Sequence, residues 1–167
     1  MASKKGIAIT AAIVAGIIAA SALIWAMPQG NTTAANITDD EFSEEEIANR
    51  PADNLSFVYT EHNFIITQVE SSFENWVDES ISSGEMSNEI IDAEAGAQQL
   101  RNRLVQPPQE WQTSYSLYEQ ALDKFDEYLD EMETLVDSEE RELSPELESL
   151  KEEMDALIEQ SIDSFPT

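Results

Sequence analysis

Residues 111–136, WQTSYSLYEQALDKFDEYLDEMETLV, decide the fold of this chain. Large apolar side chains recur in this stretch at intervals that alternate between four and three residues. They are Trp111, Tyr115, Tyr118, Leu122, Phe125, Leu129, Met132 and Val136. This spacing places them all on one side of an α-helix, whereas a strand would need a period of two. The sequence therefore predicts an amphipathic helix over 111–136 whose apolar stripe is formed by these residues.

Such a helix needs partners, because helical stability in proteins comes mainly from packing an apolar face. Apolar residues recur at helical spacing in further segments, which cover about 54–82, 87–104 and 145–165. Short connections between helices favour antiparallel neighbours. The sequence therefore predicts an all-α fold, in which an N-terminal single transmembrane helix is followed by an antiparallel (up-down-up-down) four-helix bundle. A homo-oligomeric coiled coil built on 111–136 is the alternative.

Local signals mark the ends of these helices. Ser83-Gly84 is predicted to end the first helix of the bundle, and Ser87 is a good N-cap for the second. Pro107-Pro108 stops the second helix, since proline lacks a backbone donor. Ser144-Pro145 begins the last helix, with proline at its first position, and Pro166 closes it.

The chain is strongly acidic, and its acids are confined to one part of the sequence. It has 167 residues, with 35 Asp and Glu against 8 Lys and Arg, and every acid lies at Asp39 or later. Such a surface repels phosphate, which argues against a nucleic-acid partner. The Arg101 and Arg103 pair is interpreted as cations near a helix C-terminus. The absence of cysteine excludes disulfides and thiolate metal sites.

The N-terminal residues predict a membrane anchor over 1–28. Residues 6–27 contain no charge and would span about 33 Å as a helix, against a hydrocarbon core of about 30 Å. Lys4 and Lys5 favour a cytoplasmic N-terminus, which places the remainder of the chain outside a bacterial or archaeal cytoplasmic membrane. A cleaved signal peptide is the alternative, because Ala20-Ser21-Ala22 fits the small-x-small cleavage pattern.

Residues 29–52 have the composition of an acidic, flexible linker, and 53–167 are predicted to form the acidic helical-bundle ectodomain. Three sequences match the acceptor pattern for N-glycosylation, at Asn31, Asn36 and Asn54. We expect modification at these asparagines if the source organism has the glycosylation machinery.

The sequence predicts no catalytic, cofactor-binding or metal-binding residue. A di-iron bundle needs paired Glu-x-x-His motifs, but His62 is the only histidine. We interpret His62 as an edge-of-core residue with one satisfied nitrogen, rather than as a haem ligand paired with Met86, Met132 or Met154. There is no Gly-x-Ser-x-Gly elbow and no phosphate-binding glycine loop. The aromatic side chains are predicted to fill the core, except Tyr128, which lies off the apolar stripe and is predicted to be a surface contact.

Together these features favour a non-catalytic interaction or accessory role at the cell envelope, with a membrane protein or cell-surface molecule as partner. An extracytoplasmic ligand- or cation-binding bundle is the first alternative. A sensory input module that acts through a partner protein is the second.

Overall fold

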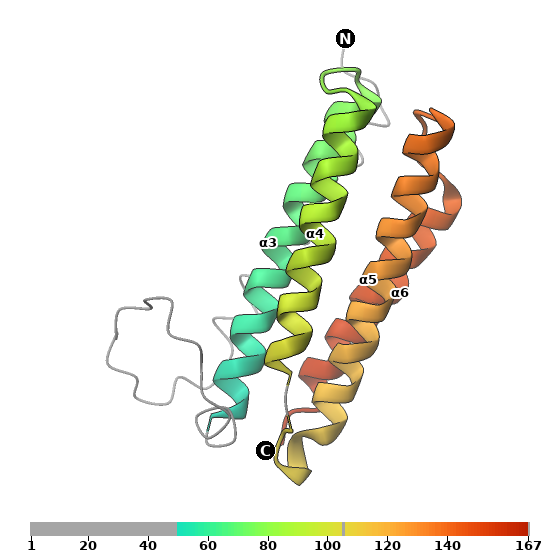
Figure 1. The fold of residues 1–167 in the computed structure, drawn as a ribbon. Coiled ribbons are helices and arrows are strands. Elements are labelled where there is room, and N and C mark those ends of the chain that lie inside the picture. Colours follow the sequence, from blue (N-terminus) through green and yellow to red (C-terminus); the bar gives the residue numbers. More distant parts are fainter. Residues whose placement is uncertain (1–49, 105, 167) are drawn as a thin grey trace. The chain divides into compact units, whose positions relative to one another are not determined.

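The computed structural model describes residues 50–104 and 106–166, and the part of the chain that it describes is all-helical (Figure 1). All the helices described here lie within one compact unit, which ends at residue 167. None of these helices is long and apolar enough to cross a membrane. The predicted anchor, most of the linker, and Asn31 and Asn36 lie outside the described residues.

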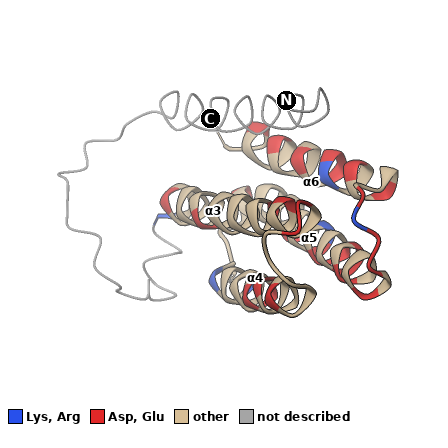
Figure 2. Ribbon diagram, turned by 90° about the horizontal axis from the view of Figure 1, so that it is seen from above, with Lys and Arg blue, Asp and Glu red and all other residues tan. Residues whose placement is uncertain are grey.

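The bundle contains four α-helices and one short 3₁₀ turn in its described part. They are α3 (Pro51–Val77), α4 (Ser83–Arg103), η1 (Gln109–Trp111), α5 (Gln112–Ser138) and α6 (Pro145–Asp163). Consecutive helices run antiparallel, and the closest pairs are α3 with α4, α4 with α5, and α5 with α6 (Figures 1 and 2). As a result α3 and α5 run in the same direction across a diagonal of the bundle.

The turn between α3 and α4 differs from the predicted one. α3 ends at Val77, earlier than the predicted boundary near Ser82, and α4 already begins at Ser83. The reason is a capping box, in which Ser82 and Glu85 satisfy each other's backbone N–H groups. The signal Ser-x-x-Glu was present in the sequence, but the prediction placed the N-cap at Ser87. Gly84 therefore lies in the first turn of α4 instead of ending α3.

The second half of the bundle begins and ends close to the predicted positions. Trp111 belongs to the 3₁₀ turn, so α5 itself begins at Gln112. Ser144 caps α6 as predicted, since its hydroxyl accepts from the Leu147 backbone N–H at 3.0 Å. Pro145 occupies the first turn, where its missing N–H costs nothing.

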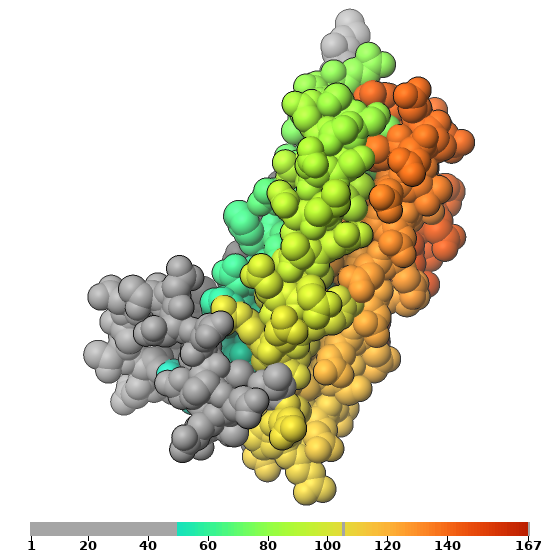
Figure 3. Space-filling model, viewed as in Figure 1, coloured from blue at the N-terminus to red at the C-terminus, as the bar shows by residue number. Residues whose placement is uncertain are grey.

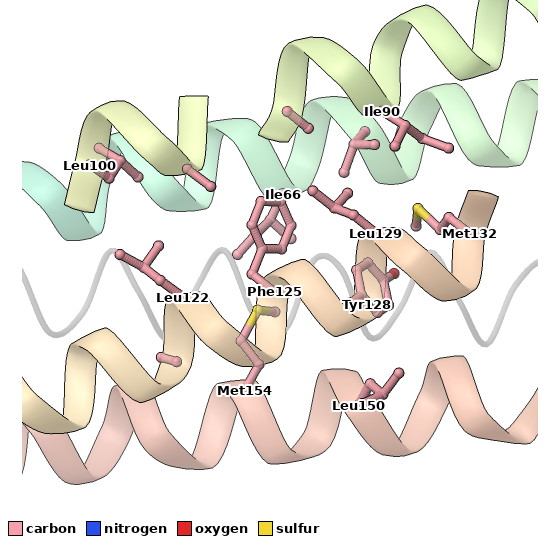
Figure 4. Close-up of a cluster of buried hydrophobic side chains, with 14 of the residues drawn as sticks. Ile66, Ile90, Leu100, Leu122, Phe125, Tyr128, Leu129, Met132, Leu150 and Met154 are labelled. Atoms are coloured by element: carbon pink, nitrogen blue, oxygen red, sulfur yellow. The ribbon is translucent and has the colours of Figure 1, made fainter. Parts of the chain in front are cut away.

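All four helices contribute to a single core (Figure 4). Every residue of the predicted apolar stripe on α5 is buried except Trp111, which is partly buried and packs against Phe165. Ile66 from α3, Ile90 from α4 and Met154 from α6 contact this cluster. The partners that the stripe requires are thus supplied within the chain, as the four-helix interpretation predicted.

Candidate functional site

Three tyrosines of α5 form hydrogen bonds with three polar residues of α3 inside the bundle. The α3 residues are Asn54, His62 and Glu70, each eight residues after the one before. Eight residues are slightly more than two helical turns, so successive members of this set lie about two turns apart along α3. Because α3 and α5 run in the same direction, their partners Tyr115, Tyr118 and Tyr128 also follow in order along the chain. We call this set the α3–α5 polar pairs.

The central pair is enclosed completely. His62 has no solvent exposure, and its Nδ1 lies 3.0 Å from the hydroxyl of Tyr118. Burial, with a smaller contribution from the Arg101 charge, lowers the pKa of His62 to about 3. Burial also raises the pKa of Tyr118 well above its usual value. Both side chains are therefore neutral at physiological pH.

The surroundings of His62 leave its second nitrogen without a hydrogen-bond partner among the described residues. The ring of Phe125 packs edge-on at 4.8 Å between centroids and fills the adjacent space. The prediction of one satisfied nitrogen is confirmed, but the predicted position at the edge of the core is wrong. Met86, Met132 and Met154 are also fully buried, as part of the apolar core.

The pair at Glu70 includes a lysine from a third helix. The Oε1 atom of Glu70 accepts from the Tyr128 hydroxyl at 3.1 Å and from the ammonium group of Lys151 on α6. Burial, followed by the charge of Glu70, raises the pKa of Tyr128 well above its usual value. The prediction that Tyr128 is a surface contact is wrong, because its side chain is 4% exposed and its hydroxyl donates to Glu70 of α3. α5 packs against both α4 and α6 and so buries residues beside the predicted stripe, among them Ala121, Tyr128 and Leu135.

Asn54 forms the polar pair nearest the N-terminus of α3. Its amide nitrogen donates to the Arg103 carbonyl at 3.0 Å and to the Tyr115 hydroxyl at 3.1 Å. Tyr115 in turn donates to the carbonyl of Pro51 at 3.1 Å. Because Asn54 is only 1% exposed, the folded domain has no room for a glycan at this position. In the folded domain Asn54 is therefore a core residue that connects α3 to α4 and α5.

The positively charged residues of the described part are used to connect helices. Arg101 on α4 contacts Asp123 and Asp126 on α5, with its closest approach 2.6 Å from Asp126. Lys124 on α5 contacts Glu153 on α6 at 3.1 Å. Lys151 connects α6 to α3 through Glu70, as described above.

The remaining arginines act on local or aromatic partners. The Arg103 guanidinium lies 4.6 Å from the ring centroid of Phe57 and so connects α4 to α3. Arg141, in the α5–α6 connection, donates to the carbonyl of Trp76 and covers its indole ring. Arg50 pairs with Asp53 at the start of α3. The prediction that Arg101 and Arg103 lie near a helix C-terminus is confirmed, since both lie in the last turn of α4.

Most surface acids are therefore left without a cation in the described part of the chain, and they concentrate on α5 and α6 (Figure 2). Between these helices runs a groove of about 270 Å³. Its lining residues are Glu127, Asp130, Glu131, Thr134, Glu146 and Leu150. The described residues contain no group of three or more ligating side chains placed to hold a metal ion. The groove is accordingly an anionic surface and lacks the geometry of a coordination site.

No protein-family model, curated protein or solved structure matches this chain. Its candidate functional features therefore rest on the geometry above. Sequence analysis missed the roles of Asn54, Glu70 and Lys151. The eight-residue repeat of polar residues on α3 is the signal that could have revealed the first two, because it falls among apolar positions of a predicted core helix.

Proposed function

We propose that this protein is a non-catalytic interaction module that attracts a positively charged partner to the cell envelope. The observation that carries the proposal is the uncompensated charge of α5 and α6. These two helices contain 15 acids and two lysines, and Lys124 and Lys151 are both engaged between helices. Their field favours encounter with a cationic surface and speeds association.

The interior of the bundle supports a binding role over a catalytic one. The most strongly perturbed groups are His62, Tyr118 and Tyr128, all buried side chains that form hydrogen bonds with other core residues. A catalytic acid or base has to reach its substrate, so groups enclosed in this way are structural. The polar pairs fix how α3 and α5 lie against each other and so hold the acidic surface in one shape.

We further propose that residues 6–27 hold the module at the cytoplasmic membrane, with the bundle on the outer side. The length and lack of charge of this segment support an anchor, and Lys4 and Lys5 support a cytoplasmic N-terminus. Protease added to intact cells is then expected to remove the bundle. Protection in intact cells combined with digestion in lysates would contradict this topology.

The interaction role is tested by chemical crosslinking in intact membranes, followed by mass spectrometry. The test variant neutralises exposed acids of α6 by Glu148→Gln, Glu152→Gln and Glu159→Gln. A matched control neutralises three exposed acids of the other hairpin, by Glu61→Gln, Glu74→Gln and Asp92→Asn. We expect crosslinks to a reproducible cationic neighbour to fall severalfold in the α6 variant and to persist in the control. Equal crosslinking by the wild type and the α6 variant would contradict the proposal.

A further inference from the structure

Each of the three connections between the helices contains one non-glycine residue with a positive φ in the described part of the chain. They are Glu79 between α3 and α4 (φ 61°), Gln106 between α4 and α5 (φ 23°), and Glu139 between α5 and α6 (φ 57°). Figure 1 shows the α4–α5 connection at one end of the bundle and the other two connections at the opposite end. The backbone around Gln106 differs from the backbone around the other two residues, and this difference indicates where the chain can change its path.

Glu79 and Glu139 belong to helix ends that are held by matching pairs of backbone hydrogen bonds. The N–H groups of Glu79 and Ser80 donate to carbonyls in the last turn of α3, at 3.0 and 2.7 Å. Those of Glu139 and Glu140 donate in the same way to carbonyls in the last turn of α5, at 3.2 and 3.0 Å. This is the Schellman motif, in which a left-handed residue after a helix allows the last carbonyls to be satisfied. The turn inside each hairpin is therefore held by bonds of its own.

Gln106, in the connection between the hairpins, has no such compensation. Among the described residues, its N–H group makes no hydrogen bond back to the end of α4. Gln106 also precedes Pro107, and steric contact with a proline ring pushes the preceding residue towards extended backbone with a negative φ. Pro108 is itself extended, at φ −52° and ψ 151°. The reversal between α4 and α5 thus holds Gln106 in a conformation that the following proline disfavours.

The contacts between the two hairpins do not depend on this connection. All four helices contribute to the apolar core, and Figure 3 shows α4 packed along the α5–α6 hairpin. The α3–α5 polar pairs, the Arg101–Asp126 pair and the Glu70–Lys151 pair each join one hairpin to the other. Because two copies of the chain have the same sequence, the hairpin of a second copy can make each of these contacts equally well.

From this arrangement we propose that two copies of the chain exchange hairpins and form a dimer. The α3–α4 hairpin of each copy then packs on the α5–α6 hairpin of the other, and residues 104–108 run extended between the two bundles. Five extended residues span about 17 Å. Exchange keeps the contacts of the core and releases Gln106 to the extended conformation that a following proline favours. The inference goes beyond the proposed function and does not depend on it, because it uses only contacts inside the bundle.

The first test refolds the purified full chain from urea at low and at high protein concentration, in detergent because of the proposed anchor. Analytical ultracentrifugation then measures the ratio of dimer to monomer. We expect dimers to form at high concentration and to persist after dilution, because a return to the monomer requires the two hairpins to separate. Monomers at every concentration, or dimers that dissociate as soon as they are diluted, would overturn the proposal.

The same measurement on Gln106→Gly tests the role of the connection. Glycine adopts a positive φ without steric cost, so the variant stabilises the monomer, and we expect the ratio of dimer to monomer to fall about tenfold. Glu139→Gly is the matched control, because Glu139 also has a positive φ but lies inside one hairpin. The control should leave the ratio within about twofold of the wild type, since the turn of that hairpin is kept on exchange. An unchanged ratio in Gln106→Gly, or equal falls in the two variants, would overturn the proposal.

A second test distinguishes exchange of hairpins from association of two intact bundles. Glu70→Lys brings two ammonium groups together between α3 and α6, and Lys151→Glu brings two carboxylates together there. Exchange between these two variants joins opposite charges in both bundles of a mixed dimer, so neither variant needs to fold alone. One variant carries a heavy-isotope label, the two are refolded together, and native mass spectrometry separates mixed from unmixed dimers. We expect mixed dimers well above the half that chance would give, whereas mixed dimers at or below half would overturn hairpin exchange.

Discussion

The helices of the α3–α4 hairpin carry eight acids and two arginines, whereas those of the α5–α6 hairpin carry 15 acids and two lysines. The hairpins are similar in length, so net charges of −6 and −13 reflect a real difference in surface density. Yet both contribute to the same core, and three polar pairs connect α3 to α5 inside it. The two hairpins therefore share one core, and they differ in the charge of their surfaces. The surface of α5–α6 is the more strongly anionic of the two, and it carries the proposed attraction to a cationic partner.

The first prediction concerns whether the two hairpins unfold separately. Phe125→Ala removes a fully buried ring that lies beside His62 of the other hairpin. We expect a loss of about 3–5 kcal/mol in the free energy of unfolding, measured by urea denaturation. Amide hydrogen exchange should then accelerate in α3–α4 as much as in α5–α6. Faster exchange confined to α5–α6 would show two independent bodies and contradict a shared core.

The second prediction concerns pH and the polar pair at the centre of the bundle. The pKa of His62 is about 3 in the folded chain and near 6.5 in the unfolded chain, so below pH 6.5 only the unfolded chain takes up the proton. Stability is therefore lost as the pH falls from 6.5 towards 3, by about 3 kcal/mol between pH 7 and pH 4. Urea denaturation at the two pH values measures this loss.

The control for that experiment is His62→Gln, which has no group that titrates in this range. Other carboxylates titrate in both proteins, so the informative quantity is the difference between their pH dependences. The variant should be less stable at pH 7 and should lose less stability on acidification. An identical pH dependence in the two proteins would show that His62 is not held neutral by its surroundings.

The third prediction removes Lys151, one of the cations that join the two hairpins. Lys151→Met leaves the carboxylate of Glu70, whose side chain is 10% exposed, with the Tyr128 hydroxyl as its remaining hydrogen-bond partner among the described residues. We expect a loss of about 1–3 kcal/mol, because an unpaired carboxylate is costly in a buried position. The double variant Glu70→Gln with Lys151→Met should recover part of it. A double variant less stable than Lys151→Met alone would contradict this account of the charge pair.

The sequence predicted the helices much better than it predicted the polar interior. Helical spacing of apolar residues identified all four helices, because burial acts on every turn and leaves a repeated signal. Tyr128 and His62 were predicted to lie nearer the surface than they do, since the burial of one residue depends on how neighbouring helices cross. Asn54 resembled a modification site because the three-residue pattern says nothing about burial. Hydrogen bonds between α3 and α5 join residues 56 to 64 positions apart, and no local pattern encodes such a pairing.

The last prediction has the smallest effect and sharpens the difference in surface charge. Repulsion among exposed acids falls as salt screens it, so the melting temperature of the full chain should rise with sodium chloride. Neutralising Glu148, Glu152 and Glu159 should reduce this rise, because it removes three charges from the hairpin where the acids are densest. Each neutralisation is worth a few tenths of a kcal/mol, so the effect amounts to about 1–2 °C.

The matched control is the variant with Glu61→Gln, Glu74→Gln and Asp92→Asn, which removes the same net charge from α3 and α4. If repulsion depends on local density, this control reduces the salt dependence less than the α6 variant does. If the two variants respond equally, net charge alone governs the salt response, and the division of the surface has no consequence for stability. The two hairpins would then differ only in what they present to a partner, which the crosslinking variants measure separately. At 0.1 M salt, charges more than about 10 Å apart are already largely screened from one another, so above this concentration it is mainly repulsion among near neighbours that still responds to salt. A response set by local density is therefore the expected result.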